Sequence, residues 1–195
     1  VLDGNSENNR TALNSLSESD CDAVLLLDAE LNCPCGTGLS LQFAEPYPEL
    51  VRTPHYQRLG LQLLRLFSLL RPQIAIFSLH DLPQYWLANR INEECFLPVN
   101  ITAAALAPTP TNDAQEQLLH TVLQRCAQAI SAGQDVVGAL QRGRQILESR
   151  GYSIRYFDCY DIFTLIHTTK AGADAILWAQ LDNNIQSSHS VRLGT

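Results

Sequence analysis

The stretch RTPHYQRLGLQLLRLFSLLRPQIAIFSLHDLPQYWLANR, residues 52–90, carries most of the information about the fold of this chain. Its apolar residues recur at helical spacing over residues 55–70. Arg71-Pro72 ends that helix, because the residue before a proline avoids helical backbone. The apolar run at residues 73–77 predicts a buried strand, and residues 82–91 predict the next helix. This order is typical of half of an α/β nucleotide-binding unit.

Polar side chains gather where the predicted strand ends, at Ser78, His80, Asp81 and Gln84. Ligands of open parallel sheets bind just beyond the carboxyl ends of the strands. We therefore expect a binding site here. For His80 and Asp81 two interpretations stay open: contacts to a phosphate or metal, or a helix cap by Asp81 beside a surface imidazole.

The remaining elements follow from the same patterns. Further strands are expected at residues 23–27, 39–43 and 98–103, a proline-rich linker at 107–113, helices at 112–133 and 135–150, and strands at 153–160 and 174–180. The resulting fold class is α/β: a partial Rossmann-like, nucleotidyltransferase-like parallel sheet followed by a small α+β C-terminal domain. We place the nucleotide-binding domain at residues 1–108 and the small lid-like domain at residues 109–195.

Composition narrows the classes of function. The chain of 195 residues is 46% hydrophobic, which supports a packed core, and its net charge of −7 makes it a poor general binder of nucleic acid. It has no apolar run long enough for a membrane span and no leader pattern, so a cytoplasmic location and no membrane partner are expected. The chain begins at Val1 and contains no Met, which we interpret as a missing upstream segment.

The cysteines do not form a disulfide pattern. Cys33-Pro34-Cys35 is the one tight pair, with Cys21 nearby, and no second pair completes four zinc ligands. Structural or incidental thiols are the expectation, and a metal at Cys33 and Cys35 stays open.

The residues around the helix and strand resemble the pantothenate synthetase (pantoate–β-alanine ligase) family. Arg52-Thr53-Pro54-His55-Tyr56 is similar to the family's Arg-Pro-Gly-His-Phe turn, and Leu66-Phe67 with Arg71-Pro72 to its helix end. The run from Ile74 to Gln84 resembles the family strand that leads into Phe-Gly-Glu-Lys-Asp-x-Gln-Gln. Near the C-terminus, residues 152–158, 161–165 and 174–185 resemble the family's small domain and its closing Asp-Asn tail.

The resemblance implies an ATP-dependent amide ligase that activates pantoate as an adenylate and passes it to β-alanine. It implies ATP and Mg²⁺ as cofactors and a pantoate-like acid as substrate. The roles it implies are catalytic for His80 and Asp81, substrate or ATP binding for Arg52, His55, Ser78 and Gln84, and a metal contact for Asp81 through Mg-ATP. It also implies a dimer, so we expect a homo-oligomer or pairing with an N-terminal half or a homologue.

Three departures from the family pattern lead us to expect impaired catalysis. The His-x-Gly-His turn and the Asn-Pro-x-Gln-Phe segment do not occur before Arg52, and His80 stands where the family has Lys. The family's Ser-Ser-Arg-Asn clasp is also missing, and residues 103–113 contain no Arg or Lys. Each lost contact of this kind costs on the order of 2–4 kcal/mol of transition-state stabilisation.

Three hypotheses follow. The first is a divergent, catalytically impaired pantothenate synthetase-like protein, as a fragment or a relative. The second is a non-catalytic binding or scaffold homologue. The third is a divergent ligase that uses another substrate and another phosphate clamp.

Overall fold

A computed structural model describes residues 22–25, 38–104, 114–182 and 188–193. Contacts along the chain separate it into two units, residues 1–41 and residues 42–195. In the first unit the described residues form neither helix nor strand. Of the strand expected at residues 23–27, positions 23–25 are irregular, and the other two lie outside the described residues together with the Cys33–Cys35 pair.

The strand expected at residues 39–43 is wrong, since these residues have no strand partner. The side chain of Phe43 instead stacks on Tyr47, with 4.9 Å between ring centroids. It also lies against Gly60, where an added Cβ would come within 2.7 Å of the Phe43 ring. Alternating apolar residues predict a strand only where a neighbouring strand is available to pair.

The helix and strand of the opening stretch are confirmed. After the short 3₁₀ helix η1 (Glu49–Val51), helix α3 spans Pro54–Leu70. It begins with proline in the first turn, where the missing N–H is no loss. It ends at Arg71, whose backbone is left-handed (φ 46°) and whose N–H donates to the Phe67 carbonyl at 3.0 Å.

Strands β1 (Ile74–Ser78) and β2 (Asn100–Ala104) pair in parallel, in the register Ile74↔Asn100, and are connected through η2 (Leu79–Asp81) and helix α4 (Leu82–Glu94). This is the expected β-α-β unit. β1 is less buried than expected, because Ile74 and Ile76 are 59% and 69% exposed. A parallel strand is buried on both faces only where other elements cover both, and in the described residues one face of this two-stranded sheet stays open.

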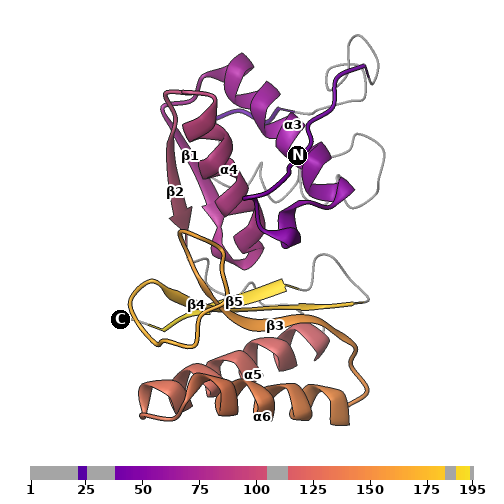
Figure 1. Cartoon of the computed structure of the whole chain (residues 1–195), viewed down its shortest axis with the longest axis vertical. Helices are drawn as coiled ribbons and strands as arrows, with labels where there is room; N and C mark the ends of the chain where they lie inside the picture. Colours follow the sequence, from indigo (N-terminus) through magenta and orange to yellow (C-terminus); the bar gives the residue numbers. More distant parts are fainter. Residues whose placement is uncertain (1–21, 26–37, 105–113, 183–187, 194–195) are drawn as a thin grey trace. The chain divides into compact units, whose positions relative to one another are not determined.

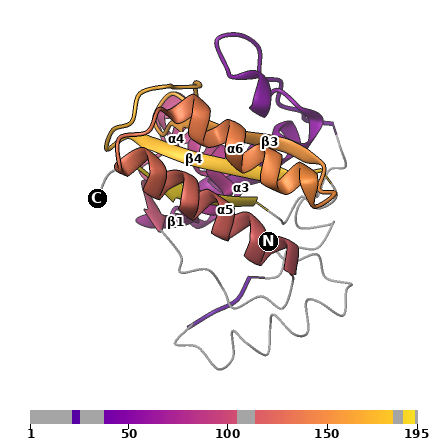
Figure 2. The same cartoon turned by 90° about the horizontal axis from the view of Figure 1, so that it is seen from below.

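The second part of the unit is a three-stranded antiparallel sheet in the order β3-β4-β5, formed by β3 (Ile154–Asp161), β4 (Ala175–Leu181) and β5 (Ser188–Arg192). Helices α5 (Ala114–Ser131) and α6 (Val136–Ser149) lie side by side across one face of it (Figures 1 and 2). β5 was not among the expected strands. Its sequence, Ser-His-Ser-Val-Arg, is too short and polar to reveal a strand.

β4 is buried along its whole length and joins two hydrophobic clusters. Its odd-numbered residues, such as Leu177, pack with α5 and α6, while Ile176 and Trp178 pack with α4 on the other face. The α/β class, with a parallel sheet and a separate small α+β part, is therefore confirmed. The division at residues 108 and 109 stays a prediction.

Candidate site at the strand end

The turn at residues 52–56 has side-chain contacts to residues on either side of it in the chain. Gln57 donates its amide to the Arg52 carbonyl at 3.3 Å, and the Arg52 guanidinium lies 3.8 Å from the exposed carboxylate of Glu45. The Arg52 Nε atom is buried and has no hydrogen-bond partner among the described residues. His55 packs edge-on against Tyr56, with ring centroids 5.0 Å apart.

Beyond β1, the polar side chains cap the helices that follow. The Ser78 hydroxyl accepts from the His80 N–H at 3.1 Å and opens η2. The Asp81 carboxylate accepts from the Gln84 N–H at 3.4 Å and caps α4. Asp81 therefore has the structural role that the sequence left open, and its metal contact stays a prediction.

The surroundings of Asp81 change its acidity. Burial raises the pKa of its carboxyl above the usual value, while the hydrogen bond from Gln84 and the imidazole of His55 act in the opposite direction. The pKa of Tyr56 is raised by its own burial and further by the negative charge of Asp81. Asp81, His55 and Tyr56 thus form one electrostatically coupled group.

A small cavity of about 40 Å³ adjoins this group. It lies between the turn, with Thr53, His55 and Tyr56, and residues of the antiparallel sheet: Arg155, Tyr156 and Gln180. The Arg155 guanidinium lies over the Tyr156 ring at 5.7 Å. The tertiary structure therefore brings a cation to the turn that sequence reasoning did not assign to the site. Arg155 lies in the predicted strand at residues 153–160, but nothing in the pattern shows which element it faces.

His80 is directed elsewhere. Its Nδ1 atom accepts from the Ser190 N–H at 3.2 Å, and its carbonyl accepts from the Trp178 indole at 2.9 Å. Its ring lies 5.1 Å from the ring of His189, which in turn lies 5.6 Å from that of His120. We call His80, His120 and His189 the histidine cluster.

The histidine cluster is partly buried. His189 is only 8% exposed, and burial, with smaller effects from the two neighbouring imidazoles, lowers its pKa to about 4. The Nδ1 atoms of His120 and His189 are buried without a hydrogen-bond partner among the described residues. A cavity of about 220 Å³ opens beside His80 and His120 and shares no lining residue with the cavity at His55.

The predicted site residues are therefore divided between two places. Arg52, His55 and Asp81 lie around the turn, with Ser78 and Gln84 in capping contacts at the strand end, while the His80 ring joins the histidine cluster. Sequence reasoning missed His120 and His189. His189 lies on β5, which the pattern did not reveal.

Within the part of the chain that the structure describes, no group of three or more His, Cys, Asp or Glu side chains is arranged to hold a metal ion. Cys95, Cys126 and Cys159 are free thiols. None of the described helices has the length and apolar character needed to cross a lipid bilayer.

Comparisons with known proteins agree on one group of relatives. The chain is 29% identical to the pantothenate synthetase of Acidiphilium cryptum over 181 residues, which cover 84% of this chain and 65% of the relative. It is 26% identical to the pantothenate synthetase of Thiobacillus denitrificans, covering 80% of this chain and 62% of that protein. The chain thus spans a little under two thirds of the length of these curated relatives. No family model matches the chain.

Solved structures show the same fold. The crystal structure of pantothenate synthetase from Thermus thermophilus matches 97% of this chain and 75% of its own, with a TM-score of 0.74 and 20% identity. Pantoate–β-alanine ligase from Francisella tularensis, crystallised with β,γ-ATP and β-alanine, matches 93% of this chain and 68% of its own, with a TM-score of 0.60 and 16% identity.

Proposed function

The chain belongs to the pantothenate synthetase family, and we propose that it is a member with impaired catalysis. The activity concerned is the ATP-dependent ligation of pantoate to β-alanine, a step of pantothenate biosynthesis. The observation that carries the proposal is the division of the candidate residues between the turn and the histidine cluster. A reaction of this type depends on holding several groups around one substrate, so separated groups supply little of the required positioning.

The position of His80 supports the impairment most directly. The resemblance places a lysine there, whose fixed positive charge suits a phosphate group. The imidazole of His80 instead accepts a backbone hydrogen bond from β5, so its Nδ1 lone pair is engaged. An imidazole that accepts through one nitrogen is in its neutral form and offers no full charge to a phosphate.

The described residues do not fit ATP in this arrangement. The cavity beside His55 has about 40 Å³, which is enough for a few water molecules and far below the roughly 300 Å³ at which small-molecule sites begin. Mg²⁺ is commonly held by one or two carboxylates together with the phosphates of its nucleotide. In the proposed site, Asp81 is the carboxylate available for this, and it already caps α4.

Binding of a small acid is the part of the function that these residues support best. Cationic or basic groups lie around the turn, from Arg52, His55 and Arg155. The buried Nε–H of Arg52 donates to no acceptor among the described residues. We propose that the carboxylate group of a pantoate-like acid binds at this turn, with the rest of the acid outside the 40 Å³ cavity and with Ser78 and Gln84 at the margin of the site. We also propose pairing with a second copy or with a homologue, as the resemblance implies.

A second candidate is a non-catalytic binding or scaffold homologue. It is favoured by the same contact of His80, because the bonds from Ser190 and Trp178 tie the strand end to the antiparallel sheet and serve structure rather than chemistry. The two candidates differ in whether any turnover remains.

A pyrophosphate-release assay on the 195-residue protein, with ATP, Mg²⁺, pantoate and β-alanine, separates them. We expect turnover at least about a thousandfold below a full-length pantothenate synthetase assayed in parallel, because the loss of several contacts costs about 4 kcal/mol or more of transition-state stabilisation even when their effects are not additive. Calorimetric titration with pantoate alone tests acid binding. Turnover at an ordinary rate of about 1–10³ s⁻¹ would overturn the proposed impairment.

The substitution His80→Lys tests the missing charge. Lysine cannot accept from the Ser190 N–H, so its ammonium is released from β5 and adds a positive charge at the strand end. We expect the affinity for inorganic phosphate to rise by a factor of about five, the size of one exposed charge contact. His80→Gln is the matched neutral control, and equal affinities of the two variants would show that charge at this position is not what limits binding.

A further inference from the structure

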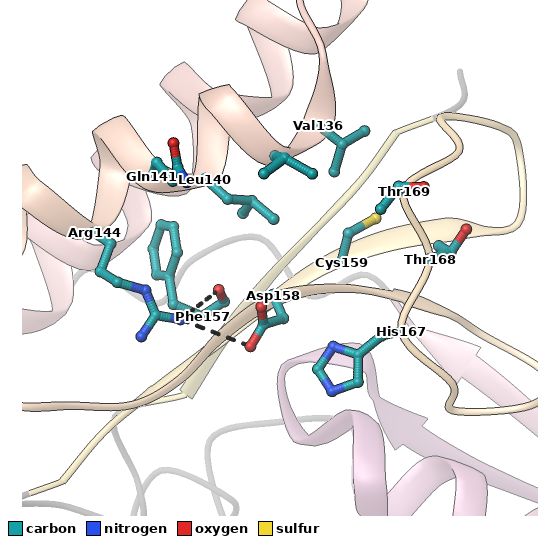
Figure 3. Close-up of a pocket in the computed structure, with 11 residues that line it drawn as sticks. Val136, Leu140, Gln141, Arg144, Phe157, Asp158, Cys159, His167, Thr168 and Thr169 are labelled. Carbon is teal, nitrogen blue, oxygen red and sulfur yellow. Dashed lines mark hydrogen bonds and ion pairs between the residues drawn. The ribbon is translucent and has the colours of Figure 1, made fainter.

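A cavity of about 220 Å³ lies between α6, β3 and the segment at residues 167–169 (Figure 3). It shares no lining residue with the candidate site at the strand end. One wall is apolar and formed by the α6 side chains Val136 and Leu140, and the end of the cavity holds Arg144 and Asp158.

The cavity lies at an interruption in the edge of the antiparallel sheet. The chain after β3 folds back and pairs with its last residues, through Asp161 N–H to the Ile166 carbonyl and Thr168 N–H to the Cys159 carbonyl, both at 2.9 Å. Further along the edge, the carbonyl of Phe157 accepts instead from the Arg144 side chain at 3.2 Å. Because alternate residues of a strand direct their backbone groups to the same edge, the Cys159 N–H also faces this side.

Arg144 and Asp158 form a loose pair. The nearest nitrogen and oxygen are 3.8 Å apart, which is beyond hydrogen-bond distance, and the two side chains are 41% and 35% exposed. A guanidinium has five N–H donors, so most of those on Arg144 remain available for a ligand. The nearby Cys159 thiol adds no charge, since burial raises its pKa to about 11.

We propose that this cavity binds a small aliphatic amino acid as its zwitterion, with the carboxylate on Arg144 and the ammonium on Asp158. The apolar wall of Val136 and Leu140 receives the side chain. A simple carboxylic acid fits less well because Asp158 repels it, and a simple amine fits less well because Arg144 does. The cavity is below the range of drug-sized sites, which is consistent with a ligand of this size.

Titration of the isotopically labelled 195-residue protein with L-leucine, followed by amide chemical shifts, tests the proposal. We expect saturable shifts confined to α6, β3 and residues 167–169, with a dissociation constant on the order of 1 mM. N-acetyl-leucine, which lacks the ammonium, and leucinamide, which lacks the carboxylate, should each bind at least about tenfold more weakly. The absence of saturable shifts, or equal binding of all three compounds, would overturn it.

Charge-specific variants add a result that a purely structural ion pair would not produce. Arg144→Gln should abolish leucine binding, and Asp158→Asn should weaken leucine while strengthening N-acetyl-leucine, because the repulsion is gone. Arg150→Gln, on the exposed end of the same helix, is the matched control and should leave both affinities unchanged. Thermal melting of each variant verifies folding, and a folded Asp158→Asn protein that binds both compounds as the parent does would contradict the proposal.

Discussion

His80 and Asp81 are neighbours in the chain, yet they belong to two regions with different physical character. Asp81 caps a helix through a backbone N–H three residues away and lies beside His55 and Tyr56. His80 is held by β4 and β5, about a hundred residues further along the chain, through the Trp178 indole and the Ser190 N–H. The local contact follows from helix geometry, while the distant contacts require the assembled sheet.

The two regions therefore respond in opposite ways to acid. Burial raises the pKa of Asp81, so the folded state takes up this proton more readily than the unfolded chain does. Burial lowers the pKa of His189 to about 4, so the folded state resists protonation there. By linkage, acid adds stability through Asp81 and removes it through His189.

The largest expected effect is the loss of stability in acid through the histidine cluster. The unfolded chain binds the His189 proton near pH 6.5 and the folded state near pH 4, so stability falls over this interval by on the order of 3 kcal/mol. Urea denaturation at several pH values measures it. His189→Gln should flatten the dependence, and an unchanged slope in this variant would assign the loss to other groups.

A smaller effect is expected from Trp178→Phe. The phenyl ring keeps most of the packing of this 1% exposed side chain but leaves the His80 carbonyl without its indole donor. We expect the free energy of unfolding to fall by about 2 kcal/mol, measured by denaturation at neutral pH.

Trp86→Phe provides the comparison for that measurement. Trp86 is also buried, and its indole donates a hydrogen bond to the Phe163 carbonyl at 2.8 Å. This bond does not involve His80. The Trp86→Phe variant should lose a similar free energy of unfolding, and its stability should depend on pH as that of the parent does. If Trp178→Phe were as stable as the parent, the distant contacts of His80 would not be what holds this region.

The smallest effect separates the two roles of Asp81. Asparagine caps helices as well as aspartate, whereas alanine cannot, so Asp81→Ala should be about 1 kcal/mol less stable than Asp81→Asn. Both variants lose the carboxylate and its charge beside Tyr56, so urea denaturation at neutral pH measures the cap alone. Equal stability of the two would show that the 3.4 Å contact to Gln84 contributes nothing to folding.

Sequence reasoning succeeded where the determinants are local. Arg71-Pro72 at the end of α3 and residue 135 before α6 mark boundaries that the structure reproduces within a few residues. It failed for residues 39–43 and for β5, because a strand is defined by its partner and not by its own side chains.

For the site, the sequence identified polar residues after β1 but treated them as one group. Adjacent side chains at a turn can point to different elements, and only the packing of β4 and β5 directs His80 toward His189. The same packing brings Arg155 to the turn at His55, a cation that the sequence did not assign to the site.

The order of amino acids was sufficient to predict the helices, the parallel β-α-β unit and the resemblance to one enzyme family, while it left the cap at Asp81 as one of two interpretations. These depend on spacing and on contacts within a few residues, which the chain encodes directly. Only the folded molecule shows which residues lie next to His80, His189 and Arg144. Their neighbours belong to elements distant in the chain, and these elements come together as they pack around the antiparallel sheet, whose strand β4 is buried on both faces.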